Sequence, residues 1–235
     1  MTRPALVALL ALSACAPRPA PMAVPARSAA RSATADWVAR ARTADVPPLP
    51  DGTPPDVRYA TRLVAEKRLT AELDASVGWV RACDTYWDAT EGREVWDPTG
   101  QGAGHVLRGT YTLHDVGPDE AVAVVTCDFG TFQGAYVLVH VQAGRAFLLR
   151  AAYVGPDGAV SGPPSPIFAT PTFTPGARMF ETLALARETG DCGLLSRYRL
   201  GDGTLATLVE ARSRDCDDRA EAAPPDTWPV VFPRP

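Results

Sequence analysis

A succession of short β-forming runs constrains the fold of this 235-residue chain more than any other feature. After Gly104, glycine-containing turns separate segments that are rich in β-branched and aromatic residues. These segments are HVLRGTYTLHDV, AVAVVTC, GAYVLVHV, RAFLLRAAYV, RMFETLALAR, LLSRYRL and TLATLVEAR. Short strands at this spacing are typical of antiparallel sandwiches and barrels. The sequence therefore predicts a mainly β domain, an antiparallel sandwich or a barrel-like structure.

The chain begins with a segment typical of an export signal. Arg3 is followed by an apolar run, residues 5–12, that is too short to span a bilayer. The ending LSAC, at residues 12–15, resembles the lipobox of bacterial lipoproteins. This resemblance implies cleavage before Cys15 and attachment of a lipid through its sulfur. An ordinary signal peptide with a cysteine near the cut is the alternative.

The composition after Cys15 predicts a tether and then a folded body. Up to about Pro55 the chain is mostly Pro, Ala, Arg, Ser and Thr, which bury too little apolar surface to offset the entropy of ordering. Only DWVARAR, residues 36–42, has the pattern of a transient helix. A clearer helix is expected from Asp56, as its N-cap, to about Leu73. We therefore predict a signal peptide at 1–14, a disordered tether at 15–55 and one domain at 56–235.

Four cysteines remain if Cys15 carries a lipid. An even number of cysteines in an exported chain indicates disulfides, because the space outside the cytoplasm is oxidising. Zinc is the competing interpretation. It is disfavoured because the four form no Cys-x-x-Cys pair and lie far in sequence from the three histidines. The four cysteines are Cys83, Cys127, Cys192 and Cys216.

The last two strands predict how these cysteines pair. With Asp202 and Gly203 as a two-residue turn, Leu200 faces Leu205 and apolar residues separate from charged ones. The open end of this hairpin then carries one cysteine on each side, although their offset requires a bend. We therefore predict a Cys192–Cys216 bridge, which leaves Cys83 to pair with Cys127.

A second hairpin is expected around Ala143 and Gly144. In its register His140 faces Phe147, and both of its faces are apolar, so we expect the hairpin to be central. His140 is then a packed strand histidine and not a ligand or base. The following Pro- and Gly-rich segment, residues 155–176, is expected to be a long loop between two sheets or halves.

The C-terminal part resembles a bacterial envelope family defined as a domain of unknown function, DUF1176. The likeness extends over about residues 83–232. It rests most on a Gly-Asp-Cys-Gly motif, a strand pair ending in Glu-x-Arg, a second cysteine and a Trp-Pro pair. These positions are Gly190, Asp191, Cys192, Gly193, Glu210, Arg212, Cys216, Trp228 and Pro229. The resemblance implies an exported, disulfide-bonded protein and no particular activity.

One stretch, WVRACDTYWDATEGREVWDP, interleaves aromatic residues with acids. Such a surface can bind sugars or peptides, and paired carboxylates can act as acid and base on a glycosidic bond. Alternatively, the tryptophans close one end of the β domain while the acids face water. The candidate ligand surface comprises Asp84, Tyr86, Trp87, Asp88 and Trp96.

Other patterns exclude several classes of function. The formal charge of −4, without a basic stripe, argues against nucleic-acid binding. The glycine-rich segment 99–105 follows no strand and opens no helix, so it is not a nucleotide loop. The acidic cluster at residues 215–218 offers too few oxygen ligands for calcium. We expect no metal, no cofactor and no catalytic residue.

Together these features predict a lipid-anchored protein of the bacterial cell envelope that faces the periplasm or the exterior. The first hypothesis is a non-enzymatic binding or scaffold module, with an envelope protein or cell-wall glycan as partner. The second is an inhibitor of an envelope hydrolase such as lysozyme, by analogy of fold alone. The third is an enzyme acting on cell-wall glycan.

Overall fold

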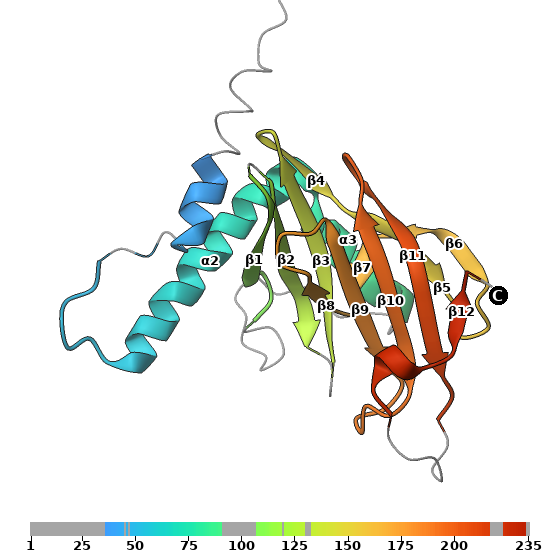
Figure 1. Ribbon diagram of the computed structural model, residues 1–235. Helices are drawn as coiled ribbons and strands as arrows, with labels where there is room; N and C mark the ends of the chain where they lie inside the picture. Colours follow the sequence, from blue (N-terminus) through green and yellow to red (C-terminus); the bar gives the residue numbers. More distant parts are fainter. Residues whose placement is uncertain are drawn as a thin grey trace, which may run out of the picture.

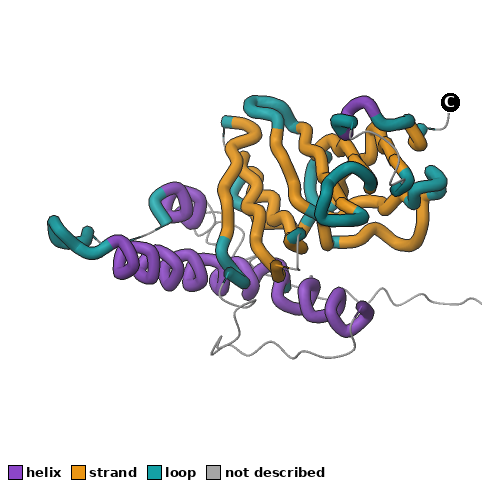
Figure 2. Tube along the Cα trace, turned by 90° about the horizontal axis from the view of Figure 1, so that it is seen from below, coloured by secondary structure: helices purple, strands orange, loops and turns teal. Residues whose placement is uncertain are grey.

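A computed structural model describes residues 36–44, 46, 48–90, 107–118, 120–129, 133–216 and 223–233. A short helix at residues 36–42 precedes α2 (Pro55–Val77) and α3 (Trp79–Thr90), and these helices lie on one side of the β structure (Figures 1 and 2). Strands make up 44% and helices 24% of the structure, which confirms the mainly β class.

Two sheets form a sandwich in the described residues. Sheet A has the order β1-β2-β3-β4, and β7 also pairs with β3. Its strands are β1 (Tyr111–Gly117), β2 (Glu120–Phe129), β3 (Gly134–Gln142), β4 (Arg145–Leu148) and β7 (Ile167–Phe168).

Sheet B has the order β6-β5-β11-β10-β9-β8, and β12 also pairs with β11. Its pairings are antiparallel except for the parallel pair β5 and β11. A 3-10 turn, η2 (Pro225–Thr227), precedes β12. The strands are β5 (Arg150–Val154), β6 (Val160–Ser165), β8 (Thr170–Phe173), β9 (Met179–Leu185), β10 (Gly193–Leu200), β11 (Leu205–Arg214) and β12 (Val230–Phe232).

Sheet A lies in the middle of three layers, and its apolar strands explain why. Ala123 and Val125 of β2 belong to the cluster that packs against the helices, whereas Val122 and Val124 pack toward sheet B. Because successive side chains of a strand point to opposite faces, a strand that is apolar on both faces must be covered on both. The helices cover one face of sheet A, and sheet B covers the other.

The central hairpin has the predicted register. His140 pairs with Phe147 and Val139 with Leu148, around a turn in which Ala143 and Gly144 both have positive φ, as a two-residue hairpin turn requires. After Leu148 the chain leaves sheet A and enters sheet B as β5. The N–H of Leu149 still donates to the carbonyl of Leu138 at 2.9 Å, as the predicted register requires, but the ladder does not continue beyond it and β7 takes that place beside β3.

The expectation of a long loop at residues 155–176 is wrong, because β6, β7 and β8 all lie there. Proline cannot donate a ladder hydrogen bond, so a Pro-rich segment is a poor candidate for a central strand. Here the prolines fit: β6, with Pro163 and Pro164, and β8, with Pro171, lie at the two edges of sheet B.

The predicted register of the last hairpin is also wrong by one residue near the turn. Leu200 pairs with Ala206, which leaves Leu205 about half exposed. Arg178, from the neighbouring strand connection, donates to the carbonyl of Gly201 and to Asp202 at 3.1 and 3.0 Å. These contacts stabilise a loop that is wider than a two-residue turn.

A bulge then shifts the pairing once more. Tyr198 pairs with Leu208 but Arg197 pairs with Glu210, so Val209 is the extra residue. The two shifts together bring Gly193 opposite Arg214, which places the neighbouring cysteines close to each other. Continued by one residue, this register places Cys192 opposite Asp215, so the offset from Cys216 shrinks from three residues in the expected register to one.

Both disulfides have the predicted pairing. Cys192–Cys216 closes the open end of the β10–β11 hairpin, and Cys83–Cys127 joins α3 to β2. Gly193 has a φ of 145°, and a Cβ atom there would lie 2.2 Å from the carbonyl oxygen of Ala184. A glycine is therefore required beside Cys192.

The helix expected from Asp56 to about Leu73 is present but has different ends. It runs from Pro55 to Val77, and its N-cap is Pro54 without a side-chain hydrogen bond, so Asp56 lies inside the first turn. A proline in the first turn has no N–H to leave unsatisfied, so this start needs no acidic cap.

The predicted tether does not hold for residues 36–44. Trp37, in the short helix, is 2% exposed, and its indole Nε1 donates to the carbonyl of Leu69 at 2.8 Å. Arg40 forms an ion pair with Glu72 of α2 at 2.6 Å. The folded body therefore begins before the expected boundary at residue 56.

Candidate functional site

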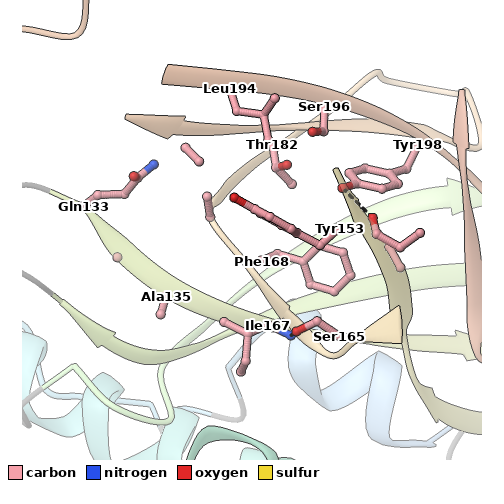
Figure 3. Close-up of a pocket in the computed structure, with 15 residues that line it drawn as sticks. Gln133, Ala135, Tyr153, Ser165, Ile167, Phe168, Thr182, Leu194, Ser196 and Tyr198 are labelled. Carbon is pink, nitrogen blue, oxygen red and sulfur yellow. Dashed lines mark hydrogen bonds between the residues drawn. The ribbon is translucent and has the colours of Figure 1, made fainter. Parts of the chain in front are cut away.

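A cavity of about 410 Å³ opens between the two sheets at the end where β3 begins (Figure 3). Strands of both sheets contribute to it, together with the segment that leads into β7. We call it the inter-sheet pocket. Its lining residues are Gln133, Gly134, Ala135, Ala151, Ala152, Tyr153, Ser165, Ile167, Phe168, Ala169, Thr182, Ala184, Leu194, Ser196 and Tyr198.

Small side chains on the inner face of sheet B create this space. Thr182 of β9 pairs with Ser196 of β10, and both are more than nine-tenths buried. Ala184 follows on the same face of β9. Further along the same strands, Phe180 and Tyr198 fill the sandwich with stacked rings 5.1 Å apart. The pocket lies where these aromatic rings give way to short side chains.

The polar groups of the pocket are hydroxyls and an amide. Burial raises the pKa of Tyr198, and hydrogen bonds from the Ser196 and Thr182 hydroxyls oppose this rise only in part. Its hydroxyl donates to the carbonyl of Ala152 at 3.4 Å. Tyr153 is 51% exposed and borders the cavity. The raised pKa keeps the Tyr198 hydroxyl neutral at physiological pH, and the amide and the Ser and Thr hydroxyls carry no charge.

Gln133 joins the two sheets at the pocket. Its amide nitrogen donates to the carbonyl of Leu183, and its amide oxygen accepts from the backbone N–H of Leu185 at 2.9 Å. Gln133 lies just before β3 of sheet A, while both of its partners lie on β9 of sheet B. This two-point contact holds the wall of the pocket in place.

A charged cluster joins the sheets at the opposite end. His140, which is fully buried in β3, lies 2.5 Å from Glu120 through Nε2. Glu120 also forms an ion pair with Arg178 at 3.0 Å, and Arg178 forms another with Asp202 at 3.0 Å. His140 packs in the strand as expected, and it also takes part in this polar link, which sequence reasoning missed.

The candidate ligand surface is only partly described. Asp84 forms an ion pair with Arg108 at 2.5 Å, and Arg108 is 4% exposed. The side chains of Tyr86, Trp87 and Asp88 lie outside the described residues, as does Trp96. Asp84 therefore holds a buried arginine in place, and the surface as a whole remains a prediction.

The first tryptophan of that stretch, Trp79, packs in the interior. It is 3% exposed, and its Nε1 donates to the carbonyl of Thr70 at 2.7 Å. Trp79 is therefore a packing residue, but it lies against a face of sheet A and does not close an end of the β domain as the alternative interpretation expected. Like Cys83, which is also on α3, Trp79 packs in the cluster between the helices and sheet A.

The described residues contain no group of three or more histidine, cysteine or acidic side chains that could hold a metal ion. In the same part of the chain, no helix is both long and apolar enough to cross a membrane. The proposed lipidation site, Cys15, and the acidic residues Asp217 and Asp218 lie outside the described residues.

The pocket residues were not identified from the sequence, although one signal was present. Ser196 falls on the inward face of its hairpin even in the expected register, and a small polar residue on an apolar face marks a gap or a contact. Its neighbours across the pocket come from strands whose pairing only the tertiary structure reveals.

The fold and the pocket together define a disulfide-bonded β sandwich with a helical layer and an open cavity between its sheets. No family model matches the chain, and neither curated proteins nor solved structures give a match. The resemblance to DUF1176 therefore stays a prediction.

Proposed function

We propose that this protein is a lipid-anchored envelope module that binds a neutral saccharide segment in the inter-sheet pocket. The observation that carries the proposal is a cavity of about 410 Å³ whose lining combines aromatic rings, hydroxyls and one amide. Ligand pockets generally have this size range and combine apolar walls with a few polar groups.

The chemistry of the lining favours a sugar over other neutral ligands. A pyranose ring presents C–H faces that can pack on an aromatic ring, as Phe168 and Tyr153 offer, and hydroxyls that both donate and accept. Ser196, Thr182 and Tyr198 supply hydroxyls of the same dual character. Since these groups do not ionise between about pH 5 and 9, we expect binding to be independent of pH in that range.

The two alternative functions have less support. Hydrolysis of a glycan needs two converging carboxylates, whereas the described carboxylate of the aromatic stretch, Asp84, is engaged by Arg108. A rigid protruding loop would support inhibition of a hydrolase, but no contact among the described residues identifies such a loop. Binding is therefore the function that we put forward.

Filling the pocket should weaken binding without unfolding the protein. The experiment uses the full chain with Cys15→Ser, to avoid the lipid, and di-N-acetylchitobiose as the probe. This parent protein, whose pocket is unchanged, should show saturable binding of the probe by isothermal titration calorimetry. Ala184→Leu should reduce the affinity at least about tenfold, because its added methyl groups occupy the space of the sugar.

Ala71→Leu, on the exposed face of α2, is the matched control and should bind as the parent does. Lack of binding by the parent, or equal binding by the Ala184→Leu variant, would contradict the proposal. Melting temperatures of both variants show whether the fold is kept.

The lipid anchor has its own test. Full-length protein expressed in a bacterial host should partition into the detergent phase, because an acylated cysteine anchors a chain to a membrane. Cys15→Ser should release the protein or block its maturation. Recovery of soluble wild-type protein with an unmodified Cys15, judged by mass spectrometry, would show that the lipoprotein interpretation is wrong.

A further inference from the structure

A second cavity, of about 590 Å³, lies where the helices meet the connection between the sheets. α2 ends at Val77, Gly78 adopts a left-handed conformation, and α3 begins at Trp79. Leu148, at the end of β4, and Ile167, at the start of β7, contribute the facing wall. We call this space the helix-joint cavity.

The walls of this cavity are mainly apolar, but two arginines also line it. Val77, Leu148, Pro166 and Ile167 provide aliphatic surface, of which Leu148 is the most buried. Arg81 comes from the first turn of α3, and Arg150 from the point where the chain crosses from sheet A to sheet B. Both arginines are exposed.

The charge of Arg150 is not compensated within the described part of the chain. Its guanidinium contacts the carbonyl of Pro164 at 3.5 Å, and it takes part in none of the ion pairs of the described residues. The residues that line the cavity include no acid. A cationic group is thus placed beside an apolar cavity without an anion to match it.

We propose that the helix-joint cavity binds an anionic amphiphile, namely an aliphatic chain that carries a carboxylate or phosphate head group. Guanidinium groups bind both kinds of oxyanion through paired N–H donors. An aliphatic chain gains free energy when it leaves water for a surface such as that of Leu148 and Ile167. A neutral apolar ligand would leave the charge of Arg150 unmatched, and a small inorganic anion would leave the apolar walls unused.

This site is independent of the saccharide site, although the two cavities share Ser165 and Ile167 as lining residues. The inter-sheet pocket lies between the sheets, whereas the helix-joint cavity lies against the helices. Ala184 lines only the inter-sheet pocket. The Ala184→Leu variant should therefore bind the amphiphile as the parent does. Failure of one proposal can therefore be told apart from failure of the other.

The test compares three ligands that share a twelve-carbon chain, each below its critical micelle concentration. Dodecanoate and dodecyl phosphate represent the two head groups, and pentaethylene glycol monododecyl ether, which is uncharged and carries no sugar, is the neutral control. With the full chain carrying Cys15→Ser, calorimetry should show one-to-one binding of at least one anion, at least about tenfold tighter than the neutral control. The anion that binds more tightly shows whether the site prefers a carboxylate or a phosphate head group.

Arg150→Gln should weaken the binding of that anion at least about fivefold while leaving the melting temperature unchanged, because the side chain is exposed. Arg199→Gln, an exposed arginine of β10 that lines neither cavity, is the matched control and should bind as the parent does. Equal affinity for the neutral ether, or equal affinities of the two variants, would overturn the proposal.

Discussion

Replacing Cys83 with serine should lower the free energy of unfolding by about 4 kcal/mol. The Cys83–Cys127 bridge spans 44 residues, and the chain-entropy model gives about this value for a loop of that length. Both cysteines are fully buried in the cluster that joins the helices to sheet A. The substitution therefore also leaves a hydroxyl and a free thiol in an apolar environment. Urea denaturation monitored by circular dichroism measures the loss.

The second bridge provides the comparison. Cys192→Ser opens a loop of 24 residues, for which the same model gives about 3 kcal/mol. Reduction of the wild type should lower stability by more than either substitution alone. A Cys83→Ser variant that denatures at the same urea concentration as the wild type would contradict the prediction, and peptide mapping without reductant would verify both pairings.

Truncation of Glu120 to alanine should cost about 2–3 kcal/mol, because hydrogen bonds to charged groups contribute this much when they are buried. Glu120 is 11% exposed and contacts both His140, at 2.5 Å, and Arg178, at 3.0 Å. Loss of the Glu120 carboxylate leaves the fully buried imidazole of His140 without this partner. His140 lies in β3, which the helices cover on one face and sheet B covers on the other. Sheets A and B would lose their charged link at this end of the sandwich.

Glu210 supplies the matched control, because it also contacts two partners, Arg197 and Arg212, at 2.7 and 2.8 Å. Its network lies at the surface of sheet B, where ion pairs contribute at most about 1 kcal/mol. Glu210→Ala should therefore cost less than half as much as Glu120→Ala. Equal losses for the two variants, measured by the same urea titration, would show that the link between the sheets adds nothing.

Those parts of the fold that depend on residues close together in sequence can be predicted from local patterns. The β3–β4 register follows from Ala143 and Gly144, since two adjacent residues that can adopt positive φ define a tight hairpin. The two-sided apolar pattern of β3 predicts its central position. The Cys192–Cys216 pairing follows from one hairpin, because a one- or two-residue error in register still leaves its open ends together.

Errors arise where distant residues decide a local conformation. The wider loop of the last hairpin depends on Arg178, which lies 24 residues before Asp202. Trp37 looks isolated in a polar tether, yet it finds a buried site beside Leu69 of α2, 32 residues away. The edge strands β6 and β8 contain prolines that only an edge position permits.

The sequence by itself determined the β class, the cysteine pairing and the central hairpin, because turn chemistry and the alternation of side chains act over a few residues. Only the tertiary structure decided where the inter-sheet pocket lies. Thr182, Ser196 and Tyr153 come from three strands, and Gln133 reaches its partner Leu183 across 50 residues. Their convergence depends on how the two sheets pack, and such packing is a sum of long-range contacts that no local pattern encodes.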